Sequence, residues 1–266
     1  MFSETPLIIM IKPYKTALLG KIRDEQRDRQ LGLALAAIAG AINAGGYLIV
    51  EHHTSHMTGI VSSFAGLVGQ AHFGAALPFL LWFVAFVGGA VVSTVLVLWG
   101  KRHRIQGVYA LPLLLEALLL LILAGIVWGQ GETTVSHSIW VVASLCFLMG
   151  LQNAVITKIS EARIRTTHIT GMTTDIGIAL ARACFFRHDP QQAIYAANKQ
   201  RLCLHILLIG AFIGGGIAGT ILFHTVGFWA VVAPAVYLIA LSVKPLERDR
   251  VVRRRVKRLK NFVNKK

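Results

Sequence analysis

Two short polar stretches contain the residue types of this chain that are best suited to binding a solute. HTSHMTG and RTTHITG share the pattern His-x-Thr-Gly at an offset of 112 residues, and each follows a long apolar segment. A threonine hydroxyl can cap the first turn of a helix, and glycine lets another group approach the backbone closely. The free amides of a helix N-terminus carry partial positive charge, which suits an anion or a polar group. The residues concerned are His56, Thr58 and Gly59, and His168, Thr170 and Gly171.

Four further polar residues lie within or beside apolar segments. Asn43 and Asn153 occupy GAINA and GLQNA, which precede the two stretches, and their amides would contact a substrate or bond to a neighbouring helix. Glu116 is set in LPLLLEALLLLILAG, where a carboxylate costs several kcal/mol unless it is neutral, partnered or in a wet cavity. It is therefore either a proton carrier or a protonated acid bonded to a helix backbone. Asp175 is a second candidate for proton coupling, because neither acid has an acidic counterpart in the other half of the chain.

The sequence gives little support to metal, cofactor or covalent chemistry. His52 and His56 are four residues apart and could share a metal on one helix face, but histidines in a loop at the membrane boundary explain them more simply. Cys146, Cys184 and Cys203 have no metal-type spacing, and we expect buried thiols that act as small hydrophobic residues. No nucleophile with a convincing base and no phosphate loop is present. We expect neither an enzyme nor a bound cofactor or metal.

The composition places these residues in a membrane protein. Of 266 residues, 55% are hydrophobic and 15% are charged, and the mean hydropathy is +0.63, which is too apolar for a soluble domain of this size. A spanning helix needs roughly 20 apolar residues. Two shorter segments, 56–71 and 168–184, contain the His-x-Thr-Gly stretches and are richer in Ser, Thr and Gly. The longer apolar segments are 31–50, 76–100, 108–129, 138–157, 203–223 and 227–243.

The basic residues predict the topology, because they mark the cytoplasmic side. If all eight apolar segments crossed the membrane, the basic residues at 101–104 and 158–165 would lie outside. If 56–71 and 168–184 instead dip in and return on the same side, all 27 Lys and Arg lie inside with both termini, and we expect this arrangement. The basic residues fall in 1–30, 101–104, 158–165, 182–201 and 244–266, and the connections 51–55, 130–137 and 224–226 contain none.

This topology gives the two halves of the membrane domain opposite orientations, as in the inverted repeats of many transporters. Three ordered matches support a duplication: GAINA with GLQNA, the two His-x-Thr-Gly stretches, and AFVGGAV with AFIGGGI, at offsets of 110, 112 and 126. An insertion around FFRHDPQQAIYAANKQR explains the last offset, and we expect a polar cytoplasmic loop there. Gly215 and Gly219 have the small-xxx-small spacing of close helix contacts. The predicted divisions are 1–30 cytoplasmic, 31–129 first repeat, 130–243 second repeat and 244–266 basic tail.

The basic tail has a pattern of its own. Residues 244–266 contain eleven Lys and Arg around an apolar stripe at helical spacing. This pattern predicts a helix that lies on the anionic inner leaflet and binds its lipid headgroups. Nucleic-acid binding is the rival interpretation, and no reader fold accompanies the tail to support it.

The SHMTG and TTHITG elements, with GLQNA before the second, resemble the YoaK-like bacterial membrane proteins, a family labelled as a domain of unknown function. The resemblance covers roughly residues 31–243. It implies a bacterial inner-membrane protein of about six spans and supplies no substrate. The chain departs from the family pattern at Asn43, where an acid is common, at Ile60, where Asn is common, and at His168, where Tyr is usual. An acid-dependent role of the first span is therefore not carried over.

We expect an all-α membrane protein with about six transmembrane helices and two short broken or re-entrant helices, acting as a transporter or channel for a small polar or anionic solute. The solute would bind where two helix ends, capped by Thr58 and Thr170, face each other near the midplane. Two alternatives remain open: broken helices that only cap each other in a closed bundle, and a non-transporting scaffold or regulator that acts through the basic tail. The expected partners are the bilayer, anionic headgroups, the solute and a possible second copy of the chain, but not nucleic acid.

Overall fold

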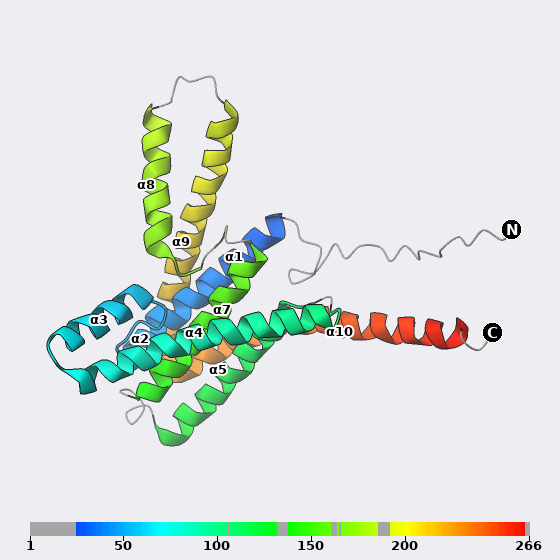
Figure 1. The fold of residues 1–266 in the computed structure, drawn as a ribbon, viewed down its shortest axis with the longest axis horizontal. Helices are drawn as coiled ribbons and strands as arrows, with labels where there is room; N and C mark the ends of the chain where they lie inside the picture. Colours follow the sequence, from blue (N-terminus) through cyan, green and yellow to red (C-terminus); the bar gives the residue numbers. More distant parts are fainter. Residues whose placement is uncertain are drawn as a thin grey trace.

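The computed structural model describes residues 25–105, 107–131, 138–160, 164, 166–185 and 192–263. Helices make up most of this part of the chain, and it contains no strand, which confirms the all-α prediction (Figure 1). The first 24 residues of the predicted N-terminal segment lie outside the described residues. The helices are α1 (Glu25–Gly40), the π-helix η1 (Ala41–Gly45), α2 (Gly46–Val50), α3 (Met57–Gly69), α4 (Phe73–Arg102), α5 (Ala110–Gln130), α7 (Ile139–Ile159), α8 (Ile169–Phe185), α9 (Gln192–Val226), the 3-10 helix η2 (Gly227–Val231) and α10 (Val232–Val263).

Five helical segments are long and apolar enough to cross a membrane, which confirms a multi-pass membrane protein. The last of them, Lys199–Glu247, runs through α9, η2 and α10. The helices α3 and α8 are shorter, 13 and 17 residues long, and cover the two segments that contain the His-x-Thr-Gly stretches. The other candidate spans are Asp28–Val50, Phe73–Arg102, Ala110–Gln130 and Ile139–Ile159.

One face of α4 is apolar and exposed along its whole length. Leu77, Val84, Val91 and Leu98 recur every seven residues on this face, and each is more than half exposed. A stripe of this length is unfavourable in water and is typical of a helix that faces lipid. The helix α4 therefore contacts the hydrocarbon core of the bilayer.

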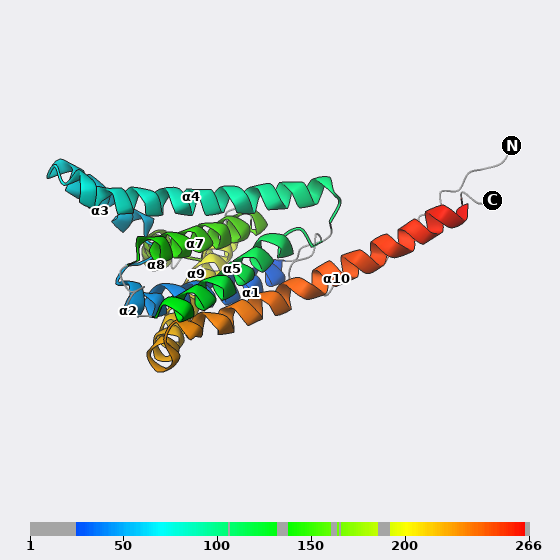
Figure 2. The ribbon, with the colours of Figure 1, turned by 90° about the horizontal axis from the view of Figure 1, so that it is seen from below.

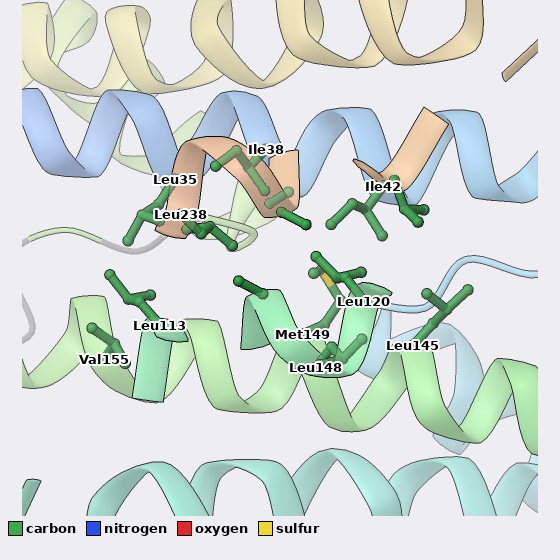
Figure 3. Packing of buried hydrophobic residues seen from close by; sticks show 14 of the residues in the cluster. Leu35, Ile38, Ile42, Leu113, Leu120, Leu145, Leu148, Met149, Val155 and Leu238 are labelled. Atoms are coloured by element: carbon green, nitrogen blue, oxygen red, sulfur yellow. The ribbon is translucent and has the colours of Figure 1, made fainter. Parts of the chain in front are cut away.

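The core lies where α1, α5, α7 and the first part of α10 meet (Figure 3). Ile42 of α1 and Leu120 of α5 are fully buried there, as are Leu145 and Met149 of α7. Leu238 of α10 joins the same cluster. The helices that carry the polar candidates are therefore held by side-chain packing.

Glycines set the closest helix contacts. A Cβ built on Gly150 of α7 would lie 2.8 Å from the Phe86 carbonyl carbon of α4, and one on Gly89 of α4 would clash with the Phe147 carbonyl oxygen of α7. Substituting a larger residue would force the helices apart, as at small-residue interfaces in membranes generally.

The contact of α1 with α9 is built in the same way. A Cβ on Gly40 would lie 2.9 Å from the Phe212 carbonyl carbon, and one on Gly215 would lie 2.6 Å from the Ala37 carbonyl carbon. At Gly219 an added Cβ would lie 2.6 Å from the Ala41 carbonyl oxygen. The prediction that the glycine runs mark close packing is confirmed.

The ends of the helices fall into two groups. In Figure 2 the start of α1, the end of α4, the start of α5 and the end of α7 lie toward the right, where α10 leaves the bundle. The opposite ends of these helices lie toward the left, with α2 and η2. The first group contains Lys101 and Arg102 in the last turn of α4 and Lys158 in the last turn of α7.

Two expectations about polar segments are wrong in part. Residues 192–201 were expected in a polar loop, but α9 begins at Gln192, because QAIYAANKQR consists mainly of good helix formers. The tail is helical as predicted, but it continues α10 to Val263 in line with the span and leaves the bundle (Figure 2). Between Leu246 and Val263 the sequence has no Gly or Pro that would end the helix and turn it onto a membrane surface.

Candidate functional site

The first His-x-Thr-Gly element is attached to the preceding span by an amide. Asn43 lies in the π-helical turn η1 and is largely buried. Its Oδ1 accepts a hydrogen bond of 3.0 Å from the backbone N–H of Ser55. Single π-helical turns are rare and often occur at functional sites. The bond fixes the chain next to the span one residue before His56.

The second element is attached in a corresponding way. Asn153 Oδ1 accepts hydrogen bonds from the hydroxyls of Thr166, at 3.2 Å, and Thr167, at 3.0 Å, and its Nδ2 donates to the Met149 carbonyl at 2.8 Å. Ser55 and Thr167 are 112 residues apart, the same offset as the two histidines. Each asparagine therefore holds the residue that precedes the histidine.

The two histidine rings cover the two glycines. An added Cβ on Gly59 would lie 2.7 Å from His56 Nε2, and one on Gly171 would lie 2.6 Å from His168 Cε1. Only glycine leaves room for the imidazole in this position. The close approach predicted at these glycines is confirmed, and the approaching group is the histidine three residues earlier.

The expectation that Thr58 and Thr170 are N-caps is wrong. The helix α3 begins at Met57, so His56 is its N-cap and Thr58 is the second helical residue. The helix α8 begins at Ile169, which places Thr170 likewise. Histidine is not a typical cap, and the His56 side chain makes no capping hydrogen bond. Both threonine side chains are exposed beside first-turn amides, where an anion or polar group could bind.

The structure does not join the two elements directly. Among the described residues, no hydrogen bond, ion pair or ring contact connects His56 or Thr58 with His168 or Thr170. In Figure 1, α3 and α8 leave the bundle in different directions. Each element forms its own half-site, and a single site shared between them stays a prediction.

Glu116 is the most buried of the predicted site residues. Its side chain is 0% exposed, and neither carboxyl oxygen has a hydrogen-bond partner. Gln152 of α7 is also 0% exposed, and both polar atoms of its amide are unpartnered. The pattern analysis did not place Gln152 in a site, although a lone glutamine within an apolar span was the available signal.

Asp175 has partners that the sequence did not indicate. Its carboxylate accepts a hydrogen bond from Arg201 at 3.0 Å, and His205 Nδ1 lies 3.8 Å away. These residues and Arg182 line a cavity of about 50 Å³ between α8 and α9. The pair with Arg201 fixes the α8–α9 hairpin, which is a structural alternative to the predicted proton coupling.

The connection from α2 to α3 contains three histidines with different surroundings. The His52 ring packs on Trp82 with a centroid distance of 4.6 Å, and the His53 ring stacks on Tyr47 at 4.6 Å. Burial lowers the pKa of His53, as do the neighbouring His56 and His52, while a hydrogen bond with the Asn43 backbone opposes the shift. Among the described residues no group of three or more His, Cys, Asp or Glu side chains converges on a metal position.

The cysteine prediction holds for one residue of three. Cys146 is buried in α7, whereas Cys184 and Cys203 are exposed. Both exposed cysteines lie in the α8–α9 hairpin, which stands away from the bundle (Figure 1) and leaves much of its surface uncovered.

Comparisons with known proteins agree with this architecture. A family described as "Protein of unknown function (DUF1275)" matches residues 31–243. The UPF0700 transmembrane protein YoaK of Bacillus subtilis (strain 168) is 23% identical over 180 residues, which cover 67% of this chain and 79% of YoaK. No solved structure matches the chain. The match over residues 31–243 includes every candidate span and both His-x-Thr-Gly elements, so the chain belongs to the DUF1275 family of multi-pass membrane proteins.

Proposed function

We propose that the protein is a transporter or channel for a small polar or anionic solute, and that the two His-x-Thr-Gly elements are the halves of its binding site. The observation that carries this proposal is the matched construction of the two elements. In each, an asparagine of the preceding span holds the chain, a histidine covers a glycine, and a helix begins. First-turn amides attract negative or polar groups, and non-helical backbone at membrane depth is tolerated where it lines a cavity.

Matched helix contacts support an inverted repeat. Gly40 against Phe212 and Gly150 against Phe86 are equivalent pairs, because 40 + 110 = 150 and 86 + 126 = 212. The contact of Gly89 with Phe147 corresponds likewise to that of Gly215 with Ala37. These offsets are those of the sequence matches. Each half supplies one helix to both contacts, which fits two repeats that exchange packing partners about a pseudo-two-fold axis.

The positions of the helix ends support six spans with both termini in the cytoplasm. A segment of 49 residues, Lys199–Glu247, would be about 73 Å long as one helix, more than twice the hydrocarbon thickness. Within it, Gly227 has a φ of 60° at the start of η2, so we count α9 and α10 as separate spans. The basic ends of α4 and α7 share one end of the bundle with the start of α1, as the positive-inside rule requires. We place that end in the cytoplasm of a bacterial inner membrane.

The second candidate function is a scaffold or regulator that acts through the tail. It is favoured by one observation, the continuation of α10 from Glu247 to Val263 beyond the bundle. A basic helix in this position also suits anionic headgroups near the membrane surface.

Reconstitution separates the two functions. A thermal-shift screen of anions, amino acids and nucleobases on the purified protein identifies a solute, and its uptake is then measured in proteoliposomes. The transport proposal predicts uptake by the full chain and by a chain that lacks residues 248–266. A solute that binds but does not cross, or uptake that disappears with the tail while solute binding persists, would favour the scaffold.

A further inference from the structure

Two fully buried polar side chains face each other's helices without partners. Glu116 of α5 and Gln152 of α7 are both 0% exposed, and all four of their side-chain polar atoms lack a hydrogen bond. Buried polar atoms are nearly always bonded, because burial without a partner is costly. Two such groups on packed helices therefore point to a ligand or a proton that completes them.

The register of α5 and α7 brings these two residues to the same level. The helices run antiparallel (Figure 2), and in Figure 3 Leu113 lies level with Val155 and Leu120 level with Leu148 and Met149. Three residues beyond Leu113 is Glu116, and three residues before Val155 is Gln152. Because both helices rise by about 1.5 Å per residue, the two side chains occupy one layer.

We propose that Glu116 and Gln152 form a cation site within the bundle, and that the bound cation is a proton. A protonated carboxyl offers one O–H donor and one carbonyl acceptor, and a glutamine amide offers an acceptor and donors in complementary positions. The two groups can then exchange two hydrogen bonds. An ionised carboxylate could only accept, would leave the glutamine oxygen unpaired, and would place a full charge at membrane depth.

No other described charged group can take the place of the proton. The helices packed against α5 are α4, α7 and α10, with η2 at its end. Their described titratable residues are Lys101 and Arg102 on α4, Cys146 and Lys158 on α7, and Tyr237 and Glu247 on α10. The lysines, Arg102 and Glu247 lie near the helix ends, Tyr237 is 45% exposed, and Cys146 is six residues from Gln152. Glu116 thus has no charged partner at its own level.

The site also has a route to the second His-x-Thr-Gly element. Gln152 adjoins Asn153, whose Oδ1 holds Thr166 and Thr167 just before His168. A change in the contact of α5 with α7 therefore displaces the residue that positions this element. On the proposed transport function, on which this role rests, the proton is the coupling ion. The proton site itself does not depend on it.

Infrared spectroscopy of the purified full chain tests the proposal without a solute. A protonated carboxyl has a C=O stretching band that shifts on exchange from H₂O to D₂O. We expect this band at pH 7 in the wild type and in Glu247→Gln, which removes an exposed acid, and we expect its loss in Glu116→Gln. A band of equal intensity in wild type and Glu116→Gln would overturn the proposal, as would its absence from the wild type. A pH titration of the wild-type band gives the same test if the variant fails to fold.

Two further arms identify the partner and the ion. Gln152→Met removes the amide at similar volume, so the Glu116 band should move to higher frequency as its hydrogen bonds are lost, and an unchanged band would exclude Gln152 as the partner. Spectra in Na⁺ and K⁺ at equal ionic strength should agree. Loss of the band in Na⁺ alone would make sodium the occupant. Because no solute is present, failure here leaves the proposed function standing, and failure of solute binding leaves this site standing.

Discussion

Replacing Gly150 by Ala should separate α7 from α4. The added Cβ would lie 2.8 Å from the Phe86 carbonyl carbon and 3.0 Å from its Cα, and these are backbone atoms that cannot rotate away. Ordinary carbon contacts lie at about 3.5–4.0 Å, so the helices must move apart by roughly 0.5–1 Å. The displacement also affects the neighbouring contact of Gly89 with Phe147.

The cost follows from two opposing effects. Overpacking of this kind costs about 1–3 kcal/mol, and Ala in place of a helical Gly returns about 0.5–1 kcal/mol. A net loss of about 1–2 kcal/mol corresponds to a fall of roughly 2–8 °C in Tm for a chain of this size. Thermal unfolding in detergent, followed by tryptophan fluorescence, measures it.

Two further variants make the test specific. Gly40→Ala, at the matched position against Phe212, should lower the Tm by a similar amount if the halves are inverted repeats. Gly125→Ala in α5 is the control, because nothing lies within 4 Å of its added Cβ, and its Tm should rise slightly. A Tm for Gly150→Ala at or above that of the control would refute the packing argument, and a neutral Gly40→Ala would refute the equivalence of the two contacts.

Three other predictions follow from the topology and the charged groups. Single cysteines at Arg104 and Arg163, in a background without native cysteines, should resist impermeant thiol reagents in intact cells, and labelling of either from outside would contradict the inverted topology. Because burial and neighbouring histidines lower the pKa of His53, the folded state disfavours its protonation, so the Tm should fall as the pH drops below about 6.5. His53→Asn should reduce this fall, and an undiminished fall would assign it to other groups. Arg201→Ala removes an exposed ion pair with Asp175 and should change stability by less than about 1 kcal/mol in a chemical-denaturation series, so a larger loss would give the pair more than a local role.

The spans were predictable from the sequence because length and hydropathy decide them. The candidate spans Ala110–Gln130 and Ile139–Ile159 differ from the predicted 108–129 and 138–157 by no more than two residues at either end. The glycine contacts were predictable for a similar reason, since small residues recurring at Gly215 and Gly219 permit close backbone approach. Local pattern was enough where one physical term dominates.

The details of the site were not predictable from the sequence, because they depend on tertiary neighbours. Thr58 has the chemistry of an N-cap, but the Asn43 bond to Ser55 holds the preceding chain so that α3 begins at Met57. The partners of Asp175 come from α9, through the register of a hairpin that no pattern indicated. The pairing of Glu116 with Gln152 likewise needs the relative register of two helices.

The central claim is that both His-x-Thr-Gly elements contribute to one solute site, and equilibrium binding of the solute to Gly59→Ala and Gly171→Ala tests it most directly. Each substitution displaces the histidine ring that lies over the glycine. Gly66→Ala and Gly177→Ala, on the same helices with nothing within 4 Å of the added Cβ, are the matched controls. The account predicts that each of the first two weakens binding by about tenfold or more, equivalent to about 1.4 kcal/mol, with non-additive effects in the double variant, while both controls bind like the wild type. Wild-type affinity in a folded Gly59→Ala or Gly171→Ala protein would contradict the shared site.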